Sequence, residues 1–170
     1  MAKKIVITGG LGYIGTEICK IYSGVSWNND IIVLDNRFIS ERVNQLRNWN
    51  IEFFQIQILD KSSLEPHLEN ADIVHHLAGI TDVAYVKKDS SKELDNKIEK
   101  VAIEGTNNIL QSMPNHCKII FPSTHVVFEG FKETKRNIDE KEKHNPIHSY
   151  STSKVKNEQH IKKSIFYLFY

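Results

Sequence analysis

The sequence predicts an α/β fold, a doubly wound parallel sheet with helices on both faces. Short, continuously apolar runs recur along the chain, and such runs are typical of strands buried on both faces. Longer segments between them carry apolar residues at helical spacing. Because crossovers between parallel strands are right-handed, we expect the strand order 3-2-1-4-5-6.

The first half of the chain supplies four strands and three helices. Apolar runs bounded by polar or glycine-rich segments predict strands at 4–9, 30–35, 51–58 and 71–79. Between these runs, the spacing of apolar residues predicts helices over 11–22 and 41–49. A short helix is expected from Ser62, with Ser62 or Ser63 as its N-cap.

The second half supplies two strands, two helices and a long loop. An amphipathic segment predicts a helix over 92–113, and the apolar run that follows predicts a fifth strand over 117–123. Residues 130–148 are polar and include a glycine and a proline, which indicates a loop. A helix over 150–163 and a sixth strand over 164–170 complete the predicted sheet.

Composition limits the function classes. A chain of 170 residues suits one domain, and its formal net charge of +1 gives no electrostatic case for nucleic acid or an anionic membrane. No apolar run is long enough to span a bilayer, and the N-terminus enters a strand at once, without room for a signal peptide. Cys19 and Cys117 stand far apart among apolar neighbours, which indicates buried thiols in a reducing cytoplasm.

The junction of the first strand and the first helix carries the sequence TGGLGYIG (8–15). Gly9 allows a tight turn, Gly12 lets a pyrophosphate approach the backbone, and Gly15 lets the helix pack against the strand. The helix N-terminus adds free N–H groups and partial positive charge. This context favours a dinucleotide site over the alternative, a purely structural glycine turn.

Asp35 ends the second predicted strand, about 20 residues past the glycines. A carboxylate there can accept both ribose hydroxyls of NAD and would repel the 2′-phosphate of NADP, so we expect NAD. Arg37, two residues further on, could weaken the preference for NAD over NADP. The alternative for Asp35 is a turn or helix-cap aspartate.

Tyr150 and Lys154 (YSTSK, 150–154) are one helical turn apart on the last predicted helix. A free tyrosine has a pKa near 10, and a lysine on the same face favours the phenolate. The pair by itself is equally compatible with two ordinary residues of a surface helix, because such spacings arise by chance. It becomes informative only in combination with other motifs.

Six motifs occur in the order and spacing of one known family. They are TGGLGYIG (8–15), VLDN (33–36), HLAG (76–79), GTNNIL (105–110), PSTHVVF (122–128) and YSTSK (150–154). Through these motifs, residues 3–163 resemble the N-terminal part of an extended short-chain dehydrogenase/reductase, of the NAD-dependent nucleotide-sugar epimerase/dehydratase family. The resemblance implies a Rossmann fold, a tightly held NAD and hydride transfer from a sugar carbon to that NAD.

The same resemblance implies the site residues. Tyr150 would be the general base, Lys154 its electrostatic partner and a ribose ligand, and Thr124 would hydrogen-bond the reacting oxygen. His75 and His76 are expected to be core or strand-end histidines, with no metal site. Cofactor contacts are expected from Gly9, Gly12, Tyr13, Ile14, Gly15, Asp35, Asn36, Gln57, Ile58, Leu77, Ala78, Gly79, Tyr150 and Lys154.

The chain departs from the family pattern at several positions. Gln57 stands where an Asp usually precedes the residue that caps the adenine, and Ala102 stands where an Asn usually supports the active-site helix. Residues 127–130 replace the usual Val-Tyr-Gly. Thr81 stands where galactose epimerases often have a Lys, which weakens a specific prediction of 4-epimerase activity.

Family members usually continue well beyond the sixth strand, so we expect residues 1–170 to be an NAD-binding domain without the family's C-terminal substrate domain. Two functions remain open. The first is an epimerase, dehydratase or reductase for a UDP- or dTDP-linked sugar, complete only with a second chain or as part of a longer ancestor. The second is a truncated NAD-binding module without turnover. The apolar end IFYLFY (165–170) predicts association with a partner, or folding back onto this domain. A homodimer formed by the helices 92–113 and 150–163 fits their apolar stripes, and so does a core-facing orientation.

Overall fold

The computed structural model describes residues 2–25, 29–81 and 91–164, which form one parallel sheet of five strands in the order β3-β2-β1-β4-β5. The strands are β1 (Lys4–Thr8), β2 (Asp30–Asp35), β3 (Glu52–Gln55), β4 (Ile73–His76) and β5 (Lys118–Ile120). The predicted doubly wound fold is confirmed in this part of the chain. The predicted sixth strand lies outside the described residues, apart from Ser164, which ends the last helix.

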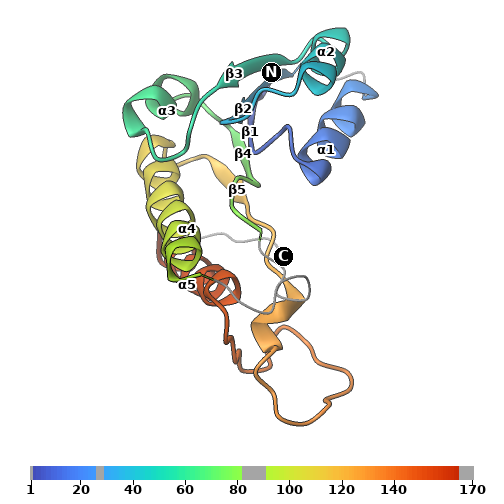
Figure 1. Ribbon diagram of the computed structural model, residues 1–170. Coiled ribbons are helices and arrows are strands. Elements are labelled where there is room, and N and C mark those ends of the chain that lie inside the picture. The colour runs from blue at the N-terminus through green and yellow to red at the C-terminus, as the bar shows by residue number, and fades with distance from the viewer. Residues whose placement is uncertain (1, 26–28, 82–90, 165–170) are drawn as a thin grey trace.

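Helices connect the strands and cover the sheet (Figure 1). They are α1 (Tyr13–Ser23), α2 (Ser40–Asn48), α3 (Lys61–Leu68), α4 (Lys92–Ser112) and α5 (Ser149–Ser164), with a short 3-10 helix, η1 (His125–Phe128), after β5. One buried cluster joins the sheet to α1 and α2. A second cluster joins it to α3, α4 and α5.

The alternation of side chains along β1 connects the two clusters. Ile5 and Ile7 point to the face covered by α1 and α2, whereas Val6 points to the opposite face. All three are buried, and burying an aliphatic side chain of this size contributes about 1.5–3 kcal/mol. A strand with two buried faces explains why the sequence is continuously apolar here.

The third strand is shorter than the predicted 51–58. The Ile56 N–H still donates across to the Asp35 carbonyl (3.0 Å), and the chain then turns, because the Asp60 N–H donates to the Gln57 carbonyl (2.9 Å). Residues 57–60 therefore form a turn that leads into α3.

The N-cap of α3 is Asp60, so the prediction of Ser62 or Ser63 as the cap was wrong. The Asp60 carboxylate accepts hydrogen bonds from the Ser63 N–H (3.2 Å) and from the hydroxyls of Ser62 (2.7 Å) and Ser63 (2.6 Å). One carboxylate thus binds the helix amide and both serines. These bonds, the one from the Ser63 hydroxyl first, lower the pKa of Asp60.

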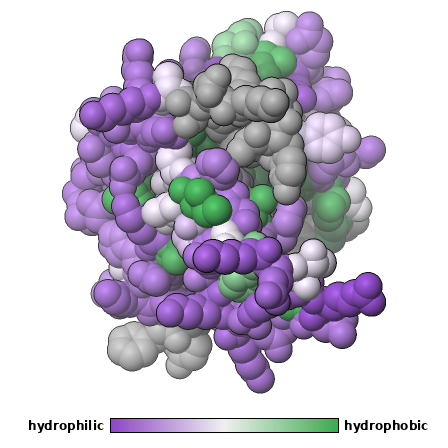
Figure 2. Space-filling view, turned by 60° about the horizontal axis from the view of Figure 1, so that its bottom comes forward, coloured by the Kyte–Doolittle hydropathy of each residue, from purple (hydrophilic) through white to green (hydrophobic). Residues whose placement is uncertain are grey.

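The carboxyl ends of β1, β4 and β5 lie at one edge of the sheet, because the strands are parallel neighbours. The segments that leave these ends are 9–12, 77–81 and 121–124. Residues 130–148 contain no helix or strand, as predicted, and extend from the end of the molecule shown at the bottom of Figure 1. Figure 2 turns this end forward and shows a mainly hydrophilic face with separated apolar side chains. No described helix is long and apolar enough to cross a membrane.

Candidate functional site

The turn after β1 depends on glycine at position 9. Gly9 has φ +70°, and its N–H donates to the Leu34 carbonyl (2.7 Å). A Cβ on Gly9 would lie 2.7 Å from the Ala78 backbone nitrogen. The turn therefore packs directly against the segment that leaves β4, as a glycine-only position allows.

The start of α1 is open. Gly12 is its N-cap and makes no side-chain cap, so the first amides of the helix lack intrahelical partners. The side chains of Tyr13 and Ile14 are 83% and 59% exposed. A Cβ on Gly15 would lie 2.6 Å from the Gly10 Cα, so only glycine permits this close packing of helix and turn. Such a helix start can bind an anionic group through its backbone.

Asp35 is buried at the end of β2 and belongs to the same turn. Its carboxylate accepts the N–H groups of Leu11 (3.0 Å) and Arg37 (3.0 Å). It also forms an ion pair with the Arg37 guanidinium, with Nε to Oδ1 at 3.3 Å. Both interpretations of Asp35 thus have support, because the carboxylate organises a turn and lies beside the helix start. Asn36, the next residue, is exposed.

Gln57 and Ile58 differ in their surroundings. Gln57 is exposed, whereas the Ile58 side chain is buried in the core against α4, where a Cβ on Gly105 would come within 2.3 Å of it. The Ile58 carbonyl accepts a hydrogen bond from Asn108 (3.0 Å). The role of Ile58 in capping the adenine stays a prediction, and its observed contacts are those of a core residue.

The two histidines of β4 are buried, as predicted. The His76 ring lies between the hydroxyls of Thr8 (3.0 Å) and Thr106 (2.9 Å), and burial, with the nearby Lys154 charge, lowers its pKa to about 3. The His75 Nε2 lies 2.8 Å from the Tyr22 hydroxyl. In the part of the chain that the structure describes, no group of three His, Cys, Asp or Glu side chains could hold a metal ion.

The segment after β4 crosses the glycine turn. The Leu77 N–H donates to the Thr8 carbonyl (3.1 Å) and the Ala78 N–H to the Thr8 hydroxyl (3.3 Å). Gly79 is exposed, and a Cβ there would meet nothing within 4 Å. The predicted contacts Leu77 to Gly79 therefore lie next to the glycine turn and reach the surface.

Thr124, Tyr150 and Lys154 come together beyond β5. The Thr124 hydroxyl hydrogen-bonds to the Tyr150 phenol, and burial raises the pKa of that phenol more than this bond lowers it. The Lys154 ammonium lies 5.8 Å from the Tyr150 ring centroid and donates to the Pro122 carbonyl (2.8 Å). Burial lowers the pKa of Lys154 to about 8, although Glu158 opposes the shift.

Aromatic contacts connect this centre to the glycine turn. Lys154 Nζ lies 4.3 Å from the Phe121 ring centroid, and the Phe121 ring lies 5.6 Å from that of His76. His76 in turn contacts Thr8, which precedes Gly9. The predicted base and the predicted phosphate turn thus belong to one continuous edge of the sheet.

Glu129 supports the start of α5, a role that no sequence pattern indicates. Its carboxylate accepts the N–H groups of Ile147 (2.9 Å) and His148 (2.9 Å) and the hydroxyl of Ser151. Burial would raise the pKa of Glu129, but these hydrogen bonds outweigh it and the pKa is lowered. The carboxylate thus fixes the residues on either side of Tyr150.

Two further polar residues of α5 were missed from the sequence. Glu158 accepts a hydrogen bond from Ser123, in the segment after β5, and thereby connects α5 to the segment that carries Thr124. Asn157 donates to the carbonyl of Ala102 on α4 (3.1 Å), while its own Oδ1 is buried without a described partner. An Asn on α5 therefore bonds the very position where the family Asn of α4 is missing.

The family comparison agrees with this geometry. The family model described as the 3-beta hydroxysteroid dehydrogenase/isomerase family matches residues 6–165. A dTDP-D-glucose 4,6-dehydratase from Dictyostelium discoideum is 32% identical, over 90% of this chain and 38% of the relative. A UDP-N-acetyl-alpha-D-glucosaminuronate decarboxylase from Bacillus cytotoxicus is 31% identical, over 75% of this chain and 38% of the relative. The chain spans less than half the length of either relative.

Solved structures of similar fold include two UDP-glucose 4-epimerases. The enzyme from Thermotoga maritima, solved with UDP-glucose, has a TM-score of 0.76 and 25% identity, over 95% of this chain and 50% of that one. The enzyme from Bifidobacterium longum, solved with NAD+ and UDP, has a TM-score of 0.76 and 26% identity, over 94% of this chain and 48% of that one. With a family model that spans most of its length, the chain belongs to the short-chain dehydrogenase/reductase family of NAD-dependent epimerases and dehydratases.

Proposed function

We propose that this chain binds NAD and supplies the general base of an oxidoreductase that acts on a nucleotide-linked sugar. The observation that carries the proposal is the meeting of Thr124, Tyr150 and Lys154 at the same sheet edge as the glycine turn. Relatives that act on UDP- and dTDP-linked sugars support the substrate class.

The dinucleotide would lie across the carboxyl ends of the strands. Its diphosphate would take the first amides of α1, which have no side-chain cap, and its adenosine ribose would lie beside Asp35. Gly79 is exposed at this edge and leaves room for the nicotinamide half of the dinucleotide, which would continue toward Tyr150. NAD, when bound, would accept a hydride from a carbon of the sugar.

Tyr150 would take the proton of the sugar hydroxyl. Because burial raises the pKa of the phenol, positive charge is needed nearby to favour the phenolate. Lys154 is the side chain in place for this, since it lies on the same helix face and its pKa of about 8 leaves it charged at pH 7. The Thr124 hydroxyl, bonded to the phenol, would orient the reacting oxygen.

The test is hydride transfer. The purified chain would be titrated with NADH to measure binding, and NADH formation from NAD would then be followed with a panel of UDP- and dTDP-sugars. We expect NADH formation with at least one sugar, and a loss of about 10²–10⁴-fold in Tyr150→Phe, because general base catalysis contributes that much. NADH affinity should change little. Tyr22→Phe is the matched control, because it removes a phenol hydroxyl that contacts His75 instead.

A dinucleotide-binding module without turnover is the second candidate, because the glycine turn and the uncapped start of α1 would bind a dinucleotide whether or not a sugar is processed. NADH binding without hydride transfer on any sugar would favour it. NADH formation that survives Tyr150→Phe would contradict the proposed role of the phenol.

A homodimer, a second chain and a cytoplasmic location stay predictions. No large apolar side chain is exposed on α4 or α5 in the described residues, and Ile109, Leu110 and Ile161 pack in the core of this chain. Light scattering at several protein concentrations would measure the oligomeric state directly.

A further inference from the structure

The carboxylate of Asp35 is already fully engaged by neighbouring donors. Oδ1 accepts the Arg37 N–H (3.0 Å) and the Arg37 Nε (3.3 Å), and Oδ2 accepts the Leu11 N–H (3.0 Å) and the Arg37 Nη2 (3.4 Å). A carboxylate offers about four acceptor positions, so none is left over for a ribose. Two of these four bonds come from the guanidinium of one side chain.

The guanidinium of Arg37 also lies over the start of α1. A Cβ on Gly12 would be 3.9 Å from Arg37 Nη2. The Arg37 side chain is 56% exposed, whereas that of Asp35 is 3% exposed. Arg37 is therefore a cation between the ribose carboxylate and the amides proposed to bind the diphosphate, and it is free to move outward.

A bound ribose would have to displace the guanidinium from Asp35. The two backbone donors, Leu11 and Arg37 N–H, would stay in place, and the two outer acceptor positions would become available to the ribose hydroxyls. The displaced guanidinium would then stand beside the ribose 2′-oxygen. This is where an arginine accommodates the 2′-phosphate of NADP, by a charge-assisted and often bidentate bond.

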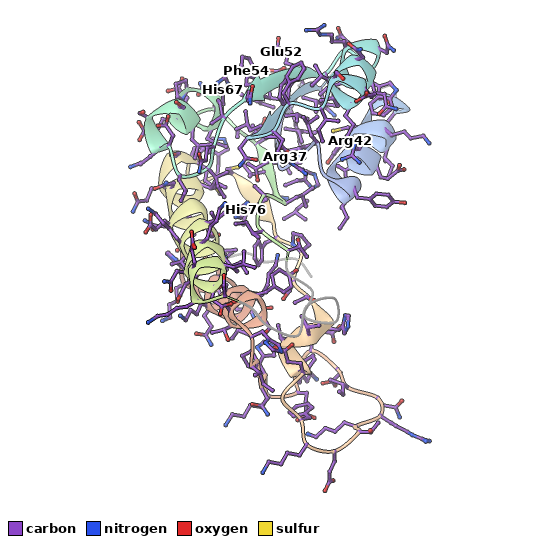
Figure 3. All side chains as sticks on the ribbon, viewed as in Figure 1. Arg37, Arg42, Glu52, Phe54, His67 and His76 are labelled. Atoms are coloured by element: carbon purple, nitrogen blue, oxygen red, sulfur yellow. The ribbon has the colours of Figure 1, made fainter. Side chains whose placement is uncertain are left out.

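We propose that Arg37 is a specificity-determining residue that admits a 2′-phosphorylated dinucleotide, so that the site takes NADP as well as NAD. This inference rests on the proposed function, because it concerns the same dinucleotide site. Asp35 alone would repel a 2′-phosphate. Arg37 neutralises that carboxylate, and its guanidinium offers N–H donors to the 2′-phosphate. Figure 3 shows Arg37 together with a second arginine, Arg42, near the start of α1, and Arg42 donates to the Leu11 carbonyl.

The test compares ADP-ribose with 2′-phospho-ADP-ribose by calorimetry, because these fragments differ only in the phosphate and need no turnover. In the wild type we expect the two dissociation constants to lie within about tenfold of each other. Arg37→Gln should raise the ratio of the 2′-phospho to the unmodified dissociation constant by about 10–100-fold, the usual worth of a charge-assisted bond of 1.5–3 kcal/mol. Asp35→Asn should lower that ratio.

The control is Arg47→Gln, which removes an exposed arginine near the end of α2 and should leave the ratio unchanged. Equal weakening of both ligands in Arg37→Gln would overturn the inference, because it would show general electrostatic attraction. Binding of ADP-ribose with more than about 100-fold weaker binding of the 2′-phospho form would overturn it while leaving the proposed function intact. Binding of neither ligand would overturn both.

Discussion

The two halves of the site are built in different ways. The glycine turn is made of backbone, and its shape depends on glycines whose missing side chains let β1, α1 and the segment after β4 approach one another. The centre around Tyr150 is made of side chains, held by polar residues such as Glu129 and Glu158 and containing a lysine whose pKa falls to about 8. The buried carboxylate beside the turn, Asp35, is paired with Arg37, whereas burial of Lys154 in the second half has a cost to folding.

The difference predicts opposite responses to substitution. In the glycine turn, the same glycines are needed for close packing and for the proposed dinucleotide binding. A side chain added at one of them should therefore reduce both stability and binding. Around Tyr150, the groups proposed for chemistry are partly unfavourable for stability, as is common where a pKa is shifted by burial. Measurements of unfolding can therefore separate the two halves before any substrate is known.

The largest effect is expected for Gly9→Ala. The new Cβ would lie 2.7 Å from the Ala78 nitrogen, and alanine disfavours φ +70°. We expect the free energy of unfolding to fall by about 3 kcal/mol in urea titrations. Gly24→Ala is the control, because Gly24 has φ −81° and a Cβ there would make only ordinary contacts at 3.6 Å. Equal stability of the two variants would contradict the close packing of the turn against the segment after β4.

Lys154→Met should instead stabilise the fold at pH 7. The fall of the Lys154 pKa from 10.5 to about 8 corresponds to about 3 kcal/mol of unfavourable burial, and the lost bond to Pro122 offsets about 1 kcal/mol. We therefore expect a gain of about 2 kcal/mol in the free energy of unfolding, together with loss of hydride transfer.

The gain from Lys154→Met should depend on pH. Below pH 8 the lysine is charged in both the folded and the unfolded state. Between about pH 8 and 10.5 the folded lysine is neutral while the unfolded one keeps its proton, so the wild type becomes more stable and the difference between the proteins shrinks. Lys156→Met, at an exposed lysine paired with Glu99, should change stability by less than about 0.5 kcal/mol. A pH-independent gain would count against the shifted pKa.

A smaller loss is expected for Glu129→Gln. The charged acceptor of two backbone amides and one hydroxyl would become neutral, which costs about 1 kcal/mol. Hydrogen exchange should become faster at the amides of Ile147 and His148 and stay unchanged in β1. Glu133→Gln, at an exposed position of the same loop, should affect neither. Unchanged exchange in Glu129→Gln would show that water replaces the carboxylate without loss.

The smallest effect is expected for Asn157→Leu. This change removes a bond to the Ala102 carbonyl but also removes a buried Oδ1 without a described partner. The two effects oppose each other, so the free energy of unfolding, measured by thermal denaturation, should change by less than about 1 kcal/mol. Asn157→Ala should be clearly less stable, because it leaves a void between α4 and α5. A large loss in Asn157→Leu would mean that the α4 contact is essential.

The sequence predicted most of the fold because strands and glycine turns are encoded locally. The run DIIVLD (30–35) predicts a strand without tertiary information, and β2 (Asp30–Asp35) begins and ends at the predicted residues. The three glycines at 9, 12 and 15 likewise follow from a spacing within eight residues. The predicted N-cap of α3 was wrong because several adjacent polar residues can cap a helix, and the sequence pattern does not distinguish Asp60 from the serines that follow it.

The supporting residues of the site could not be predicted in this way. Glu129 and Ser151 are 22 residues apart, and Asn157 and Ala102 are 55 apart, with no periodicity that pairs them. A single polar residue in a polar loop looks the same whether it faces solvent or binds a helix start. Thr124, Tyr150 and Lys154 were identified through a family resemblance, and only the structure shows which neighbours hold them.

The loop at 130–148 is closed at its base by two backbone bonds, from the Gly130 N–H to the Asn145 carbonyl (2.8 Å) and from the Asn145 N–H to the Val127 carbonyl (2.8 Å). A Cβ on Gly130 would lie 2.4 Å from that Asn145 oxygen, so this close approach at the base of the loop requires glycine. Because the ends are fixed independently of the tip, residues 132–141 can change in length at little entropic expense. That tip is accordingly the place to insert an affinity tag or a fluorophore, and the place where natural variants of this chain are freest to gain or lose residues.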